Sequence, residues 1–339
     1  MSWNPETTGE SRVKRVLVTG CCGFIGGHLM KSLANDNYES LGIDIRPPKS
    51  GAMLGWSFAE CDILDTTKLR STVTDFAPEV VVHLAARTDI DGENLADYSV
   101  NVEGTRNLVV AVAAAGTVRR VLFASSQLVC RVGYVPRSDT DYCPVNPYGE
   151  SKVLSENIVR KNMSKTITWC LLRPTTIWGE GMSKHYQRFL GHLQAGRYFH
   201  LGKGPLFKSY GYIGNTVYQI MKFVNTESGK IHGRTFYLSD YEPLSLTTWI
   251  NELAQALGTA RPRSVPVAVA RILGVGGDVV NWMGFKTFPL NSYRVRNILT
   301  EYKFDMAETE RICGALPFTT DQGVSRTVLW FRELRAGGA

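Results

Sequence analysis

The sequence lacks any uninterrupted apolar run near the roughly 20 residues that a membrane-spanning helix needs. Its first residues, 1–11, are polar and have no apolar core of the kind that marks a secretory signal peptide. We therefore expect a flexible tail over residues 1–11, no membrane span and a cytoplasmic location.

Cysteine and histidine are present without the patterns that give them structural roles. The seven cysteines include no C-x-x-C pair, and the six histidines show no spacing typical of metal ligands. An odd, scattered set of cysteines is typical of reduced thiols in a cytoplasmic protein. The sequence therefore predicts neither a disulfide framework nor a metal site.

Basic tracts and nucleic-acid-binding motifs are also absent, although the net charge is +7. A moderate positive charge suits a small polyanionic substrate such as a nucleotide diphosphate, and we expect no nucleic-acid partner. With 339 residues, of which 44% are hydrophobic, the chain can form one large α/β domain and a smaller companion.

A glycine-rich segment near the N-terminus predicts a dinucleotide site. Val16–Val18 is typical of a strand buried on both faces, and it leads into Gly20, Gly23 and Gly26 and then a helix. Glycines in such a turn permit unusual backbone angles and let a pyrophosphate approach the main chain. The free amides at the start of the helix then face the phosphates. Without a ligand, the same segment would be only a tight turn.

Acidic residues follow the next two predicted strands. Asp44 ends a strand over 38–45, about 20 positions beyond the glycines, where an acidic side chain meets the adenosine ribose hydroxyls. This favours NAD over NADP, although Arg46 could receive the additional phosphate of NADP. Asp62 allows two interpretations: it accepts a hydrogen bond from the adenine amino group, or it caps the predicted helix Thr66–Phe76.

Strands and helices alternate along the first half of the chain. Val80–Ala86 is an apolar run typical of a central parallel strand, and we interpret its His83 as a hydrogen-bonded core residue. A helix over Tyr98–Ala115 and a strand over Arg119–Ala124 follow. This alternation predicts a Rossmann-type, doubly wound parallel α/β sheet with right-handed crossovers.

Tyr148 and Lys152 are four residues apart, so on a helix they share a face one turn apart. A tyrosine with its ordinary pKa of about 10 is a poor base at neutral pH. A nearby ammonium, together with an oxidised nicotinamide, would lower that pKa. Ser126, after a strand, could hold the substrate oxygen in line with Tyr148. Alternatively, the Tyr-Lys pair lies on an exposed helix face and has no catalytic function.

Several motifs occur along the first half of the chain in a fixed order. They are T-G-C-C-G-F-I-G at Thr19–Gly26, Asp44, Asp62-Ile63, H-L-A-A at His83–Ala86, N-V-E-G-T at Asn101–Thr105, S-S at Ser125-Ser126, Y-G-E-S-K at Tyr148–Lys152 and L-R-P at Leu172–Pro174. On these motifs the chain resembles the extended short-chain dehydrogenase/reductases, in the NAD-dependent epimerase/dehydratase family.

The resemblance implies specific roles for individual residues. Tyr148 would be the acid/base, Ser126 a catalytic hydroxyl, and Lys152 the residue that binds ribose and lowers the tyrosine pKa. Asn101 would support the active-site helix. The implied contacts of the cofactor NAD are Gly20, Gly23, Phe24, Ile25, Gly26, Asp44, Asp62, Ile63, Leu84, Ala85, Ala86, Asn101, Tyr148, Lys152 and Thr175. The implied substrate contacts are Arg87, Ser126, Thr176 and Lys208.

The C-terminal half matches the family less tightly. Lys208–Asn215 resembles the family's R-D-Y-x-Y-V-x-D stretch, with lysine in place of the arginine that meets substrate phosphate. Thr235–Ser239 resembles the late strand that returns to the sheet, Leu246–Leu257 an amphipathic helix, and Gly323–Trp330 the closing helix.

These matches suggest a division of the chain into two domains. We expect an NAD-binding Rossmann domain over 12–175, to which 209–246 returns, and a smaller, mostly helical substrate domain over 176–208 and 247–335. The resemblance also implies a homodimer that pairs the helices at 98–115 and 148–163 of each subunit.

The residues after Ser126 narrow the choice of activity. Sugar 4,6-dehydratases have an Asp-Glu pair there, whereas this chain has Gln127-Leu128, which argues against dehydratases and related decarboxylases. The first hypothesis is therefore a nucleotide-sugar 4-epimerase, in which Lys208, and also Arg188, Arg294 or Arg296, hold the diphosphate.

Two other hypotheses stay open. An NAD(P)-dependent dehydrogenase or reductase, acting on a sugar nucleotide or on an apolar steroid- or flavonoid-like alcohol, is suggested by the apolar segment Val265–Phe285. An ordinary amphipathic, helix-rich lid explains that segment equally well. A non-catalytic NAD-binding regulator is the third hypothesis, and the presence of Ser126, Tyr148 and Lys152 argues against it.

Overall fold

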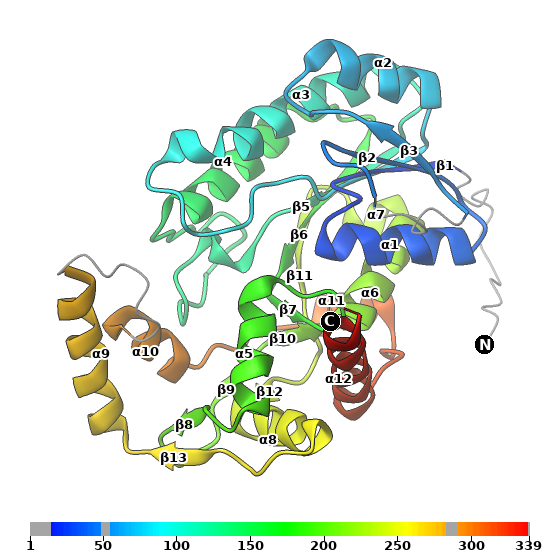
Figure 1. Ribbon diagram of the computed structural model, residues 1–339. Helices are drawn as coiled ribbons and strands as arrows, with labels where there is room; N and C mark the ends of the chain where they lie inside the picture. Colours follow the sequence, from blue (N-terminus) through cyan, green and yellow to red (C-terminus); the bar gives the residue numbers. More distant parts are fainter. Residues whose placement is uncertain (1–14, 49–54, 283–290, 338–339) are drawn as a thin grey trace.

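A computed structural model describes residues 15–48, 55–282 and 291–337, so the predicted tail over 1–11 lies outside the described residues. Its centre is a parallel sheet of seven strands in the order β11-β6-β5-β4-β1-β2-β3 (Figure 1). The strands are β1 (Arg15–Thr19), β2 (Glu39–Asp44), β3 (Ser57–Glu60), β4 (Val80–His83), β5 (Arg120–Ala124), β6 (Thr168–Pro174) and β11 (Arg234–Leu238). The predicted doubly wound parallel sheet is confirmed.

Helices cover both faces of this sheet (Figure 1). On one face pack α1 (Phe24–Asn35) and α6 (Ile213–Asn225), and on the other α2 (Thr66–Phe76), α3 (Ser99–Ala115) and α4 (Pro147–Asn162). Alternation along β1 divides the core accordingly, because Val16 and Val18 face α1 while Leu17 faces α3. Burial on both faces explains the continuous apolar runs in the strand sequences.

The rest of the chain forms a smaller, mostly helical lobe, as the sequence predicts. Its helices are α5 (Lys184–Gln194), α8 (Leu246–Leu257), α9 (Val267–Trp282), α10 (Ser292–Leu299), α11 (Ala307–Cys313) and α12 (Thr320–Ala336). Three two-stranded sheets join them, from β7 (Thr176–Trp178) with β10 (Tyr210–Tyr212), β9 (Phe207–Lys208) with β12 (Leu244–Ser245), and β8 (Phe199–Leu201) with β13 (Arg263–Val265). None of the described helices is long and apolar enough to cross a membrane.

Most predicted elements lie where the sequence places them. The helix over Thr66–Phe76 is confirmed, but its cap is Asp65, whose Oδ1 accepts a hydrogen bond from the Lys68 amide at 2.9 Å. Asp62 lies outside the helix and accepts from the Leu64 amide at 2.9 Å. The interpretation of Asp62 as the cap is therefore wrong, because Asp65 is the residue with the extended backbone directly before the first turn.

The turn between β1 and α1 depends on glycine. Gly20 has a φ of +72°, and a Cβ there would lie 2.7 Å from the Ala85 amide nitrogen. A Cβ on Gly26 would lie 2.1 Å from the Gly20 carbonyl oxygen, whereas one on Gly27 would lie 3.6 Å from the Cys21 carbonyl oxygen. The first turn of α1 therefore contacts the end of β1 through Gly26 only because Gly26 has no side chain.

We predict that Gly26→Ala lowers the free energy of unfolding by about 2 kcal/mol or more, because its methyl group would overlap backbone atoms that cannot move independently. Gly27→Ala is the matched control, one residue along the same helix. It should be neutral or raise stability by up to about 1 kcal/mol, since alanine favours helix over glycine. Denaturant unfolding of both variants checks this, and equal losses would contradict the close contact.

Candidate functional site

The start of α1 fits a diphosphate. Its N-cap, Gly23, is exposed and supplies no side-chain hydrogen bond, and the first turn has no acidic residue. The first amides of a helix need acceptors, and phosphate oxygens bind well at this end of the helix dipole. The predicted contacts Phe24 and Ile25 lie in this first turn and are both partly buried.

Asp44 lies beside the same turn, at the carboxyl end of β2. Its carboxylate accepts hydrogen bonds from the amides of Cys22, at 3.1 Å, and Arg46, at 3.2 Å. These bonds hold the carboxylate next to the glycine turn, which is the position that a ribose contact requires. The uncapped amides at the start of α1 fit the diphosphate of NAD, and the Asp44 carboxylate fits its adenosine ribose.

The segment after β4 is tied to the glycine turn. Thr19 Oγ1 accepts hydrogen bonds from the amides of Leu84, at 3.2 Å, and Ala85, at 3.1 Å. The structure therefore brings the predicted contacts Leu84 and Ala85 against Gly20. Ile63 lies farther along the sheet edge and packs against α3, where its side chain occupies the space that a Cβ on Gly104 would need.

His83 is a hydrogen-bonded core residue, as the sequence predicts. Its Nδ1 lies 2.7 Å from Thr19 Oγ1 and its Nε2 lies 3.3 Å from Thr105 Oγ1, which in turn donates to the Asn101 carbonyl at 2.7 Å. Burial lowers the pKa of His83 to about 3, and the Lys152 ammonium contributes in the same direction. The ring is therefore neutral, and it links the end of β1 to α3.

Asn101 connects three parts of the site. Its Nδ2 donates to the Arg87 carbonyl at 3.0 Å and to Ser151 Oγ at 2.9 Å, and its Oδ1 accepts from the Arg87 amide at 2.8 Å. Asn101 thus fixes the chain after β4 to α3 and to α4, the helix that carries Tyr148. The sequence assigns it this supporting position through the family resemblance alone.

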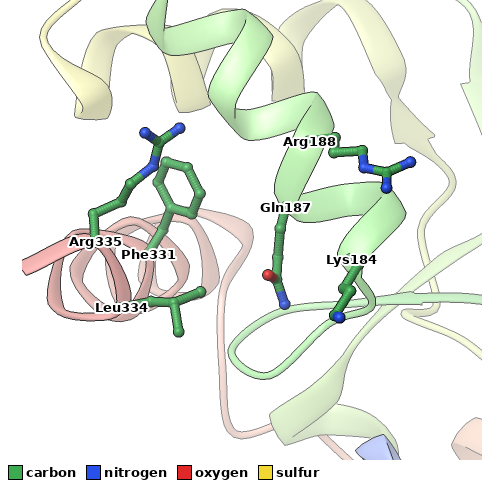
Figure 2. A pocket seen from close by; sticks show the side chains of 6 residues that line it. All are labelled: Lys184, Gln187, Arg188, Phe331, Leu334 and Arg335. Carbon is green, nitrogen blue, oxygen red and sulfur yellow. The ribbon is translucent and has the colours of Figure 1, made fainter. Parts of the chain in front are cut away.

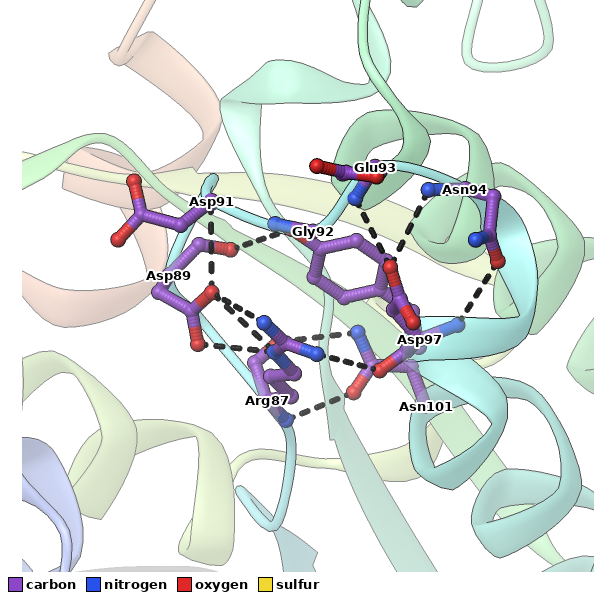
Figure 3. A network of polar contacts seen from close by, with 9 residues as sticks. Arg87, Asp89, Asp91, Gly92, Glu93, Asn94, Asp97 and Asn101 are labelled. Atoms are coloured by element: carbon purple, nitrogen blue, oxygen red, sulfur yellow. Dashed lines mark hydrogen bonds and ion pairs between the residues drawn. The ribbon is translucent and has the colours of Figure 1, made fainter. Parts of the chain in front are cut away.

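The Arg87 side chain is engaged in its own loop (Figure 3). Its guanidinium pairs with the Asp89 carboxylate at 2.9 Å, donates to the Asp97 carbonyl at 3.0 Å and covers the Tyr98 ring at 5.0 Å. These contacts order residues 87–97 beside the site. A direct substrate contact by Arg87 stays a prediction.

Ser126, Tyr148 and Lys152 lie together at the carboxyl end of β5. The Ser126 side chain lies close enough to the Tyr148 phenol to act on its pKa, and Lys152 Nζ donates to the Ala124 carbonyl at 2.9 Å. Tyr148 and Lys152 share one buried face of α4, so the alternative of an exposed helix face is wrong.

Burial sets the pKa values of Tyr148 and Lys152 in the protein without cofactor. Burial raises the pKa of Tyr148 to about 12, although the Ser126 side chain acts in the opposite direction. Burial also lowers the pKa of Lys152 to about 8, and the Glu156 carboxylate opposes that shift. In the protein alone, desolvation therefore dominates both groups, and the phenol keeps its proton at neutral pH.

A buried ion pair lies one turn beyond Lys152. Arg173 donates from Nε to Glu156 Oε1 at 2.8 Å and from Nη2 to Oε2 at 2.7 Å, and both side chains are 1% exposed. Ser125, at 2.5 Å, and Tyr142, at 2.9 Å, donate to the same carboxylate. Burial disfavours the charge of Arg173, but Glu156 outweighs it and raises the arginine pKa. This pair fixes α4 to β6.

A polar cluster next to Ser126 was not expected as a unit. Thr176 Oγ1 lies 3.0 Å from the Tyr302 hydroxyl and accepts from Gln127 Nε2 at 3.4 Å. Tyr186 lies close enough to Thr176 for the two side chains to interact, and the rings of Tyr210 and Tyr302 have centroids 6.3 Å apart. The polar cluster comprises Gln127, Thr176, Tyr186, Tyr210 and Tyr302. Neighbouring Thr175 is buried at the end of β6 and donates to the Leu238 carbonyl at 3.2 Å.

Lys208 has internal partners. Its ammonium donates to the carbonyls of Asn297, at 2.7 Å, and Thr300, at 3.0 Å, and burial lowers its pKa to about 8. Lys208 therefore holds the C-terminal end of α10, and its contact with substrate phosphate stays a prediction.

Two arginines act on the pKa of His185, a residue of α5. Burial lowers the pKa of His185, and Arg294 and Arg188 lower it further, while Asp91 acts in the opposite direction. Two of the arginines that the sequence proposes for the diphosphate, from α5 and α10, thus lie close enough to act on one imidazole.

Two further groupings lie in the described residues, and each shares one residue with the candidate site, Asp44 in the first and Arg188 in the second. Cys21, Cys22 and Asp44 lie within metal-binding distance of one another, but burial raises the pKa of both thiols, which keeps them protonated. A cavity of about 310 Å³ lies between α5 and α12 (Figure 2). Its lining is Lys184, Gln187, Arg188, Phe331, Leu334 and Arg335, and it includes none of the residues predicted for NAD or the catalytic step.

The sequence of this chain is similar to those of known proteins. The sequence model of the NAD dependent epimerase/dehydratase family matches residues 16–236. The chain is 27% identical over 321 residues to N-acetyl-alpha-D-glucosaminyl-diphospho-ditrans,octacis-undecaprenol 4-epimerase of Escherichia coli O157:H7, covering 92% of this chain and 94% of the relative. It is 26% identical to a 3-beta-hydroxysteroid dehydrogenase of Mycolicibacterium neoaurum, covering 97% of this chain and 94% of that protein.

A solved structure has the same fold. The UDP-glucose 4-epimerase of Thermotoga maritima, solved with UDP-glucose, superposes with a TM-score of 0.72 at 19% identity, covering 95% of this chain and 99% of the other.

We predict that Glu156→Gln lowers the free energy of unfolding by about 3–5 kcal/mol, because it leaves the Arg173 charge buried without its partner. Glu103→Gln is the control: Glu103 pairs with Arg106 on the exposed side of α3, and its loss should cost less than about 1 kcal/mol. Equilibrium unfolding in denaturant measures both. A small effect of Glu156→Gln would show that the pair does not hold α4 to β6.

Proposed function

The chain belongs to the NAD dependent epimerase/dehydratase family, and on this basis we propose that it is a nucleotide-sugar 4-epimerase with NAD as cofactor. The observation that carries the proposal is the grouping of Ser126, Tyr148 and Lys152 beside the polar cluster. Hydroxyl and amide groups suit the ring hydroxyls of a sugar better than an apolar substrate. The undecaprenol-linked relative and the UDP-glucose epimerase both act, by their names, on sugars attached to a diphosphate.

The proposed chemistry assigns a proton step to Tyr148. Bound NAD supplies the hydride acceptor and, in its oxidised form, a positive charge near the phenol. Tyr148 takes the proton of the sugar hydroxyl and later returns it, while Ser126 holds the same oxygen in line. Lys152 lies one helical turn away, and its ammonium would add a second positive charge that favours the phenolate. The keto sugar then rotates in the site, and the hydride returns to the opposite face of the same carbon. The product is the 4-epimer.

The diphosphate in this proposal lies near Arg188 and Arg294. Arg188, on the same helix as His185, and Arg294, on α10, both lower the His185 pKa, and a bound diphosphate would offset their positive charges. Lys208 supports the same site indirectly, because it holds the end of α10.

A dehydrogenase of an apolar alcohol is the second candidate. The apolar sequence of Val265–Phe285 suggests it, and so does the steroid dehydrogenase among the relatives. The two candidates differ in cofactor use, since an epimerase regenerates bound NAD in each turnover and a dehydrogenase consumes it.

We also propose that two subunits pair through α3 and α4 in a four-helix contact. The two helices pack side by side, and the Val110 side chain on α3 is 60% exposed. A contact of this kind would cover it. The cytoplasmic location stays a prediction.

The test is epimerisation without added cofactor. We expect protein loaded with NAD, and then freed of unbound NAD, to convert one or more of a panel of UDP-, GDP- and dTDP-sugars to the 4-epimer over many turnovers. Nuclear magnetic resonance of the sugar products measures this. Product that forms only in proportion to added NAD would instead identify a dehydrogenase.

We predict that Tyr148→Phe lowers kcat by about 10²–10⁴-fold, because only the proton-transferring hydroxyl is removed. NAD affinity should change little. Tyr218→Phe is the control, since it removes a hydroxyl that donates to the Cys313 carbonyl on α11, away from the candidate catalytic group. Turnover and NAD titration distinguish the two, and full activity of Tyr148→Phe would refute the assigned acid/base.

A further inference from the structure

Helix α9 is apolar on the side that faces away from the protein. Its buried residues are small: Ala270, Gly274 and Gly277. They pack on α10, where a Cβ on Gly274 would lie 3.2 Å from the Ser292 backbone. An ordinary surface helix buries large apolar side chains and exposes polar ones. Helix α9 instead buries small residues and exposes large apolar side chains.

The large apolar side chains of α9 point into solvent. Their exposed fractions are Val269 42%, Ile272 71%, Leu273 51%, Val275 58%, Val279 50% and Trp282 87%. We call these six residues the outer face of α9. In Figure 1, α9 forms the outer edge of the helical lobe, with α10 between it and the sheet. Contiguous apolar surface of this kind marks a site of interaction.

The width of the outer face favours a flat partner. At 100° per residue, its members spread over about 180° of the helix circumference. A helix that pairs with one other helix needs only a narrow stripe of two positions per heptad. An apolar half-cylinder is typical of helices that lie in the plane of a membrane interface.

The charges around the outer face have one dominant sign. Between residues 261 and 282 the sequence has three basic residues, Arg261, Arg263 and Arg271, and one acidic residue, Asp278. All three arginines are exposed, and Arg271 lies in α9 directly before Ile272. The Asp278 carboxylate accepts a hydrogen bond from the Ser292 amide at 3.3 Å, on the α10 side of the helix. A basic border is complementary to a surface that carries negative charge.

We propose that the outer face of α9 binds the surface of an anionic lipid bilayer. The apolar side chains enter the boundary between headgroups and acyl chains, and the arginines contact lipid phosphates. The contact is peripheral, since none of the described helices can span a bilayer. It would hold the helical lobe close to lipid.

The test is co-sedimentation of the full chain with vesicles of phosphatidylcholine and phosphatidylglycerol in equal amounts. We expect the wild type to bind these vesicles, and to bind more weakly to phosphatidylcholine alone or at high salt. The triple variant Ile272→Ser, Val279→Ser, Trp282→Ser should lose about a hundredfold in partitioning, because three exposed apolar side chains are removed. Its thermal unfolding should stay close to that of the wild type, since half or more of each side chain is exposed.

Matched controls separate this surface from general stickiness. Val135→Ser with Leu334→Ser removes exposed apolar side chains elsewhere and should leave binding unchanged. Arg271→Glu should weaken binding to anionic vesicles, whereas Arg119→Glu, at the amino end of β5, should not. The fluorescence change on vesicle addition should be smaller in Trp282→Phe.

Three results would overturn the proposal. In the first, the wild type fails to bind anionic vesicles. In the second, the triple variant binds them as well as the wild type does. In the third, the wild type is a dimer without lipid affinity and the triple variant is a monomer. The last result would assign the outer face to a second copy of the chain. Epimerisation of water-soluble sugar nucleotides is measured separately, so failure of either proposal leaves the other intact.

Discussion

Burial of one face of α4 is the constraint on which the rest of the site depends. Tyr148, Lys152 and Glu156 follow one another at intervals of four residues, and all three are withdrawn from water. Such a row of polar groups is stable only if each has a partner. The partners, in the same order, are Ser126, the Ala124 carbonyl and Arg173. These three contacts fix α4 against β5 and β6.

The sequence predicts this region well because its signals are local. Glycine spacing, apolar runs and the four-residue interval between Tyr148 and Lys152 each follow from backbone geometry over a few residues. The parallel sheet, the turn at Gly20 and the neutral core position of His83 therefore follow from the residues themselves. The family resemblance extends this reasoning to Asn101, for which no local pattern exists.

Contacts between distant segments were beyond prediction. Tyr302 reaches Thr176 across 126 positions, and nothing around Tyr302 distinguishes it from other tyrosines. The sequence likewise contains no sign of the internal partners of Lys208. Its ammonium donates to a carbonyl of α10, and this contact depends on how the two segments pack. The upward shift of the Tyr148 pKa in the protein without cofactor was also beyond prediction, because desolvation depends on everything that surrounds the phenol.

The position of β11 has a consequence for how the chain folds. This strand, Arg234–Leu238, completes the sheet by pairing with β6, more than sixty residues earlier in the chain. Until it is synthesised, β6 presents an unpaired edge to other chains, and Phe236 and Leu238 are missing from the core. During translation the nucleotide-binding half must therefore wait for a late segment, so that chains cut short before residue 234 would aggregate rather than fold on their own.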